Sequence, residues 1–203
     1  NEAPPAIISV FLGTQLTEAL AQIEHADVDK GIIINAKKEM KLGVGNIPEI
    51  LLDNTDRNRT SPFAFTGNRF EFRAVGSSQN VASAVYVINT VVAESLNEFR
   101  DEVDALEASG VERAEAVMNT VRKFVTDAKD IMFEGNGYSK EWEIESEKRG
   151  LRAVKNVPES YEVYHDPQTL DVFAKMGVLA PNEVEARFEI LNETYVKKLQ
   201  IET

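Results

Sequence analysis

Four arginines lie close together in residues 56–73 of a strongly acidic chain, and the carboxylate of Glu71 lies between two of them. The four are Arg57, Arg59, Arg69 and Arg73. Glu71 lies two residues from Arg69 and two from Arg73. A guanidinium group binds carboxylates and phosphates with two parallel hydrogen bonds, and a carboxylate can ligate a hard cation such as Mg²⁺. The segment is therefore a candidate site for anionic ligands and a metal ion.

The residues around Glu71 have the pattern of a β-hairpin. We expect a strand over residues 63–65, a turn over 66–68 and a return strand over 69–75. Gly67 supplies the positive φ that such a turn needs. Because side chains alternate along a strand, Glu71 shares one face with its two neighbouring arginines, about 6 to 7 Å from each. The opposite face is expected to be core and carries Phe70, Phe72 and Ala74.

Alternating charge has a second interpretation, because ladders of surface salt bridges are common on exposed sheet faces. In that case the arginines and Glu71 only pair with one another. Spacing alone leaves both interpretations open.

The composition excludes several classes of partner. A net charge of −12 and a pI near 4.7 argue against general binding to nucleic acid, which needs an excess of Lys and Arg on one face. The sequence contains no run of about 18 apolar residues, so no membrane-spanning helix is predicted. The chain has no cysteine, which is typical of a reducing cytosol. It begins at Asn1 without a signal peptide or an initiator Met, so we expect a piece of a longer cytoplasmic protein.

The other elements are predicted to be mostly helical. Apolar spacing predicts an amphipathic helix over 5–25, a loop with one or two short strands over 27–53, and a long helix over 80–109 that ends at Gly110. A second helix follows at once and forms an antiparallel pair with the first. Further helices are expected at 139–150, from Asp166 and from Pro181. The predicted fold class is α+β, mainly helical around a short antiparallel sheet.

Three motifs, taken together and in this order, resemble the glutamine synthetase family. They are "NEAPPA" at residues 1–6, "RNRT" at 57–60 and "FEFR" at 70–73. The longer stretch "NRTSPFAFTGN" before "FEFR" resembles the large type III class. The resemblance implies that this chain is the C-terminal part of a glutamine synthetase catalytic domain, residues 1–109, followed by a helical extension, residues 110–203.

The resemblance also implies roles for five residues. Glu2 matches the flap glutamate that closes over the substrates and takes a proton from ammonium. Arg59 matches the arginine that contacts the transferring phosphate, and Arg57 is a weaker candidate for the same region. Glu71 matches a strand carboxylate that ligates the metal ion, and Arg73 matches the arginine that binds the substrate glutamate.

The implied activity is ATP-dependent joining of glutamate and ammonium into glutamine, with Mg²⁺ or Mn²⁺ and through γ-glutamyl phosphate. Members of the family assemble as stacked rings, so a homo-oligomer is implied. The family's other metal ligands lie on strands upstream of the flap, and the isolated piece is therefore expected to be inactive. Two alternatives remain: a catalytically dead relative that binds nucleotide or acts as a scaffold, and an autonomous helical interaction module.

Overall fold

The computed structural model describes residues 7–25, 60–74, 76 and 79–202. The chain forms two compact units. One holds the described residues within 76–100 and 154–203, and the other holds those within 6–75 and 101–153. The predicted loop over 27–53 lies outside the described residues, and the predicted domain boundary at residue 110 stays a prediction.

The second unit contains a three-stranded sheet in the order β1-β2-β3. The strands are β1 Val10–Phe11, β2 Phe63–Phe65 and β3 Phe70–Phe72. β2 and β3 form the predicted antiparallel hairpin, with Gly67 at φ 94° in its turn. β1 pairs with β2 in parallel. The sheet is therefore mixed, where a purely antiparallel one was expected.

β1 corrects the prediction of one helix over residues 5–25. The helix α1 spans only Thr14–His25, and the preceding residues run extended into the sheet. Ile7 and Ser9 are buried whereas Ile8 is exposed, which is the two-residue alternation of a strand. Apolar β-branched residues suit a pleated sheet as well as a helix, and the partner strand β2 decides between them. Gly13, at φ 80°, separates strand from helix.

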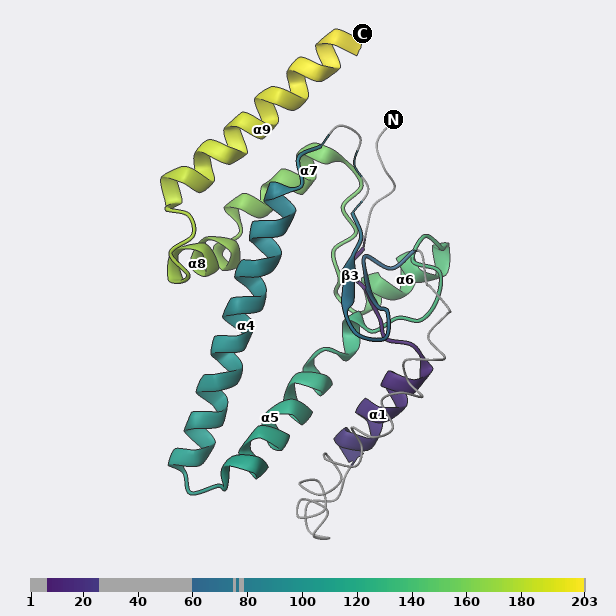
Figure 1. The fold of residues 1–203 in the computed structure, drawn as a ribbon. Helices are drawn as coiled ribbons and strands as arrows, with labels where there is room; N and C mark the ends of the chain where they lie inside the picture. The colour runs from purple at the N-terminus through teal and green to yellow at the C-terminus, as the bar shows by residue number, and fades with distance from the viewer. Residues whose placement is uncertain (1–6, 26–59, 75, 77–78, 203) are drawn as a thin grey trace. The chain divides into compact units, whose positions relative to one another are not determined.

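Besides α1 and the end of a long helix described below, the described residues of the second unit form three helical elements. They are α5 Arg113–Asp127, the 3₁₀ helix η3 Lys129–Ile131 and α6 Lys140–Lys148. α5 packs along α1 (Figure 1). The guanidinium group of Arg122 on α5 donates to the carbonyl of Ile23, 2.9 Å away, near the C-terminal end of α1. A cation at that end also interacts favourably with the helix dipole.

Trp142 on α6 is the largest fully buried side chain of the described residues. Its ring stacks on Phe133 with centroids 4.0 Å apart, and the guanidinium carbon of Arg149 lies 5.2 Å from its centroid. Arg149 also donates to the carbonyls of Asp130 and Met132. This stack fixes the chain that leads from η3 to α6.

The first unit is helical. Its elements are the first part of α4 Ala82–Ala108, then α7 Val157–Tyr161, the 3₁₀ helix η4 Glu162–His165, α8 Pro167–Lys175 and α9 Pro181–Glu202. α4 continues into the second unit and ends before Gly110, at φ 98°, as predicted. Asp166 caps α8 through the amide of Gln168, also as predicted. The prediction missed α7. The core consists of Phe173, Leu179 and Val184.

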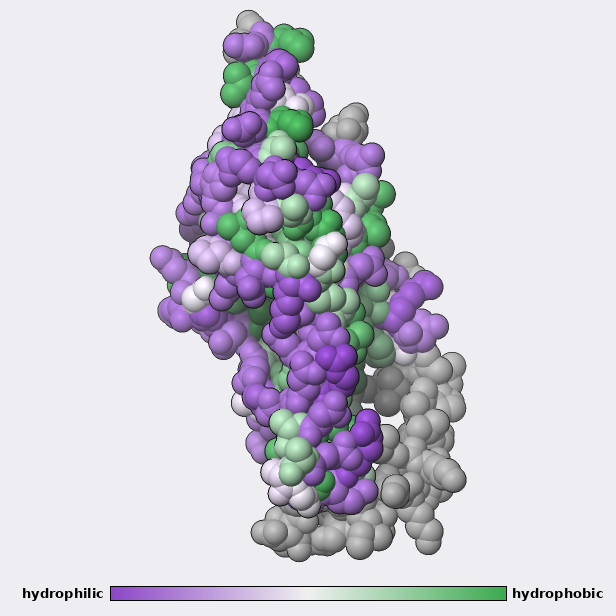
Figure 2. All heavy atoms as spheres, turned by 90° about the vertical axis from the view of Figure 1, so that its left-hand side faces the viewer, coloured by the Kyte–Doolittle hydropathy of each residue, from purple (hydrophilic) through white to green (hydrophobic). Residues whose placement is uncertain are grey.

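Apolar residues at helical spacing, such as Leu96 on α4 and Val184 and Leu199 on α9, predict one buried stripe on each helix. Each stripe is buried only in part. The face of α4 that packs in the first unit carries Tyr86 against Phe173 and Glu94 in an ion pair with Lys175. The predicted stripe instead lies at the surface there, and Leu96, for example, is 64% exposed. On α9 the stripe is buried at Val184 and exposed at Leu199. Apolar residues accordingly stand among hydrophilic ones on the face drawn in Figure 2.

The predicted fold class, α+β and mainly helical, is confirmed, since the described residues form mostly helices together with one three-stranded sheet. No described helix combines the length and hydropathy needed to cross a membrane.

Candidate active site

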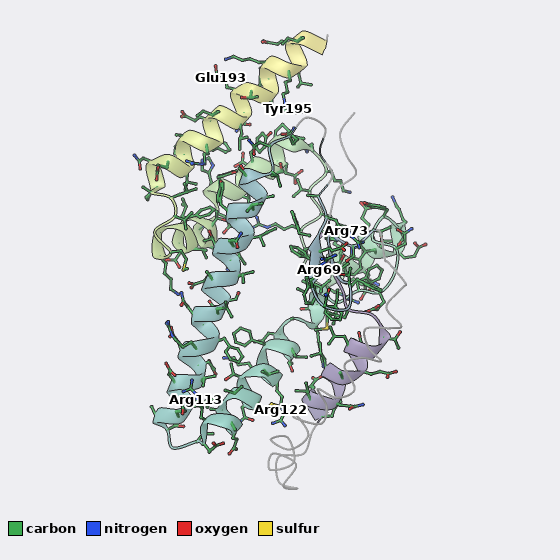
Figure 3. All side chains as sticks on the ribbon, viewed as in Figure 1. Arg69, Arg73, Arg113, Arg122, Glu193 and Tyr195 are labelled. Atoms are coloured by element: carbon green, nitrogen blue, oxygen red, sulfur yellow. The ribbon has the colours of Figure 1, made fainter. Side chains whose placement is uncertain are left out.

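The carboxylate and the arginine of the "FEFR" motif lie together, Glu71 on β3 and Arg73 directly after that strand. Arg73 Nη2 donates to Glu71 Oε2 over 3.0 Å, and both side chains are partly buried. Figure 3 shows Arg73 and Arg69 at the sheet and Arg113 and Arg122 on the helix α5. Glu71 and Arg73 therefore form an ion pair with each other, as the second interpretation of the charged segment expects. The pair also places a carboxylate, which can bind a cation, beside a guanidinium group, which can bind an anion.

The faces of the hairpin differ from the prediction. The face expected to be core carries two exposed rings, Phe70 at 53% and Phe72 at 42%. They pack across the hairpin on Phe65 and Phe63, at centroid distances of 5.3 and 5.0 Å. The strand register therefore places four phenylalanines on the more exposed face.

Glu71 belongs to the covered face of the sheet. The register aligns Phe11, Ala64 and Glu71 across the three strands, and partners in register share a face. Phe11 is buried and Ala64 is only 1% exposed. The carboxylate therefore lies at the end of an apolar row, where charges interact more strongly than in bulk water.

The sheet topology brings the start of β1, the start of β2 and the end of β3 to one edge. Parallel strands start at the same edge, so the chains entering β1 and β2 arrive side by side. The hydroxyls of Ser9 and Ser61 lie 3.2 Å apart there, both buried. β3 runs the opposite way and ends at that edge, where the Arg73 amide donates to the carbonyl of Pro62 over 2.8 Å. Each of the three chain segments leads to, or carries, a predicted site residue.

A loop from the C-terminal half of the chain, residues 132–138, contacts both ends of this sheet. At one end Glu134 Oε1 accepts hydrogen bonds from the amides of Leu12, at 3.3 Å, and Gly13, at 3.2 Å. It thereby supplies the carboxylate that the first turn of α1 lacks in its own sequence. At the other end the Gly137 amide donates to the hydroxyl of Thr60 over 2.7 Å.

The structure thus describes two of the five predicted site residues, Glu71 and Arg73, and brings them together. Glu2, Arg57 and Arg59 lie outside the described residues. Among the residues that the structure does describe, no group of three or more acidic, histidine or cysteine side chains forms a metal site. Glu71 is a suitable oxygen ligand for Mg²⁺, but it supplies one ligand of a larger set.

Sequence reasoning missed the loop 132–138. The residues "GNGY" at 135–138 predict only a break after the second helix. Nothing in the spacing of Glu134 or Gly137 indicates a contact with residues far upstream. The one available signal is the pair of glycines, which allows close approach of two backbones.

The mainly helical α+β fold is consistent with a glutamine synthetase C-terminal domain. Residues 116–203 match the family model described as the glutamine synthetase C-terminal domain. The whole chain is 47% identical to a glutamine synthetase of Bacteroides fragilis (strain YCH46) over 203 residues. It is 41% identical to a type-3 glutamine synthetase of Dictyostelium discoideum over 202 residues, and 37% identical to a glutamine synthetase of Butyrivibrio fibrisolvens over 208 residues.

The chain belongs to the glutamine synthetase family, and the resemblance predicted from the three motifs is confirmed. The relatives include a protein named as type 3, the class that the longer motif indicates. The matches cover all of this chain but only 27% to 28% of the length of these relatives.

Proposed function

We propose that this chain is the part of an ATP-dependent glutamate–ammonia ligase that supplies the glutamate-binding arginine, one metal ligand, the phosphate-contacting arginine and the flap. The observation that carries the proposal is the 3.0 Å ion pair between Glu71 on β3 and Arg73 directly after it, in the motif where the family resemblance expects them. The relatives' names support the ligase class. Activity requires the whole protein.

Arg73 is the proposed residue that binds the glutamate substrate. Its guanidinium group can bind a carboxylate with two hydrogen bonds, and its position at the end of β3 is fixed by the backbone bond to Pro62. Glu71 occupies part of that fork, because it accepts a hydrogen bond from Arg73 Nη2. Binding of glutamate would exchange one carboxylate partner for another.

Glu71 is a proposed ligand of Mg²⁺ or Mn²⁺, in company with residues elsewhere in the protein. The bound cation supplies charge neutralisation for the ATP phosphates. Glu71 would thus serve the cation, and the guanidinium group of Arg73 would serve glutamate. The ion pair therefore suits a site that prepares both groups for different ligands.

Arg59 and Glu2 complete the proposed chemistry. The glutamate side-chain carboxylate attacks the γ-phosphorus of ATP and forms γ-glutamyl phosphate with release of ADP, while Arg59 stabilises the negative charge on the transferring phosphoryl group. Glu2 takes a proton from ammonium, and the resulting ammonia displaces phosphate to form glutamine. The parallel pairing of β1 with β2 supports this division, since it brings the two chain segments that follow Glu2 and Arg59 together.

The test is an assay of the full-length protein for glutamine formation that depends on ATP, Mg²⁺ and ammonium. Glutamine formation that Glu71→Ala abolishes supports the proposal. No turnover by the wild-type protein, with nucleotide binding unchanged in Glu71→Ala, would favour the catalytically dead relative. Assembly of a homo-oligomer as stacked rings, a cytoplasmic location and inactivity of the isolated chain remain predictions of the same proposal.

A further inference from the structure

The loop 132–138 contacts the segments that flank two proposed site residues, although it belongs to the C-terminal half of the chain. Thr60 is the residue after Arg59, and β1 follows the segment that carries Glu2. The loop holds Thr60 through Gly137 and lies beside β1 through Met132, which bridges to Val10. The Phe133 amide also donates to the carbonyl of Val10 over 3.1 Å.

The contact at Thr60 is close enough to require glycine. A Cβ atom on residue 137 would lie 2.8 Å from the carbonyl oxygen of Thr60 and 3.5 Å from its hydroxyl oxygen. The nearer neighbour is backbone, so a larger side chain could be accommodated only if one chain moved. Gly137 therefore permits a backbone-to-backbone approach that also makes the 2.7 Å hydrogen bond.

The loop is itself rigidly supported. Phe133 is stacked on the buried ring of Trp142. Asn136 closes the turn by accepting from the amide of Tyr138, and Ser139 then caps α6 through the amide of Trp142. A loop fixed at Phe133 and at the start of α6 can hold Thr60 in one place.

We infer that the loop 132–138 is a positioning element of the active site, in which Gly137 and Thr60 fix the chain that presents Arg59 to the transferring phosphate. The inference rests on the proposed function. Its physical basis is that catalysis by positioning loses rate when a charged group is displaced by about 1 Å, even if the displaced group is intact. Gly137 acts through Thr60 and is a positioning residue.

The experiment compares four variants of the full-length protein. Gly137→Ala introduces the close contact, Thr60→Val removes the hydroxyl acceptor, and Thr60→Ser retains it. Gly110→Ala is the matched control, because Gly110 has a left-handed φ of 98° but a Cβ atom added there would meet no other atom within 4 Å. It strains a turn without touching Thr60.

We expect Gly137→Ala and Thr60→Val to lower kcat for glutamine formation about 10- to 100-fold. The KM for glutamate should change by less than about twofold, since Arg73 is held by the pairing of β3 with β2 rather than by the loop. Thr60→Ser should restore most of kcat, and Gly110→Ala should keep the wild-type kcat. The double variant Gly137→Ala with Thr60→Val should lose no more than the worse single variant.

A second readout does not depend on activity. Amide hydrogen exchange over residues 57–62 should be faster in Gly137→Ala and unchanged in Gly110→Ala. A Gly137→Ala protein with wild-type kcat, or with unchanged exchange over 57–62, would overturn the inference. Absence of turnover in the wild-type protein would instead overturn the proposed function, and the exchange measurement tells these two failures apart.

Discussion

Glu134 caps a helix that begins 120 residues earlier in the chain: its carboxylate accepts from the amide of Gly13 over 3.2 Å. The same oxygen accepts from Leu12 and from the hydroxyl of Thr17. At the opposite end of α1, Arg122 donates to the carbonyl of Ile23. An anion at the N-terminus and a cation at the C-terminus both stabilise a helix. The stretch 113–134 thus holds α1 at both ends and ties the family's C-terminal domain to the motif-bearing sheet.

Loss of the Glu134 carboxylate should weaken this link. Glu134→Ala is expected to lower the free energy of unfolding by about 0.5–2 kcal/mol, the usual cost of a lost helix cap. Urea unfolding followed by circular dichroism measures it. Hydrogen exchange at the amides of Leu12 and Gly13 should accelerate. Glu112→Ala, which removes the local cap of α5, serves as the control and should leave those two amides unchanged.

Arg73 should control affinity for glutamate in the full-length protein. Arg73→Lys keeps the charge but loses the planar fork, and a lost hydrogen bond between charged groups costs about 1.5–3 kcal/mol. The KM for glutamate is therefore expected to rise about 10- to 100-fold, as measured by steady-state kinetics. Arg69→Lys is the matched substitution beside the same strand. An equal rise in both variants would argue against a specific role for Arg73.

The ion pair between Glu24 and Lys129 should make stability depend on pH. The hydrogen bond from Lys129 lowers the pKa of Glu24 below its usual 4.5. A carboxyl group whose pKa is lower in the folded state stabilises the fold above its unfolded pKa and loses that contribution as the pH falls through the folded value. The free energy of unfolding should therefore decrease as the pH drops below 4.5.

Urea titrations of the wild-type chain and of Glu24→Gln, measured at several pH values on both sides of 4.5, test this point. In Glu24→Gln the free energy of unfolding should decrease less as the pH falls than it does in the wild-type chain. Lys129→Met should reduce the decrease by the same amount, and the double variant by no more, because one interaction is removed in each case. Wild-type pH dependence in all three variants would show that the pair does not stabilise the fold.

Trp142 should be both a structural anchor and a reporter of folding. It is the only tryptophan in the chain and has no exposed surface, so its emission should shift to longer wavelength on unfolding. Trp142→Ala is expected to cost about 3–5 kcal/mol, as for other buried aromatic truncations. Tyr138→Ala, at an exposed position nearby, should change stability by no more than about 0.5 kcal/mol. Equal effects of the two substitutions would contradict an anchoring role.

Local patterns predicted the hairpin, the helix caps and the long helix α4 correctly. The turn at Gly67, the cap at Asp166 and the stop at Gly110 depend on a few neighbouring residues whose backbone preferences are strong. Apolar periodicity was less informative. It assigned residues 7–12 to a helix and assigned Phe70 and Phe72 to the core, because periodicity indicates an apolar face and not what covers it.

The candidate site also has features that local sequence predicts and features that depend on the tertiary structure. The sequence alone determined which residues carry the family's motifs, that Glu71 and Arg73 alternate with phenylalanines on one strand, and that the chain is mainly helical. Tertiary structure decided that β1 joins β2 in parallel, that Glu134 caps α1 and that Gly137 meets Thr60. These contacts join residues 50 or more positions apart. Their formation depends on the combined packing of strands and helices, which no local preference of the intervening residues encodes.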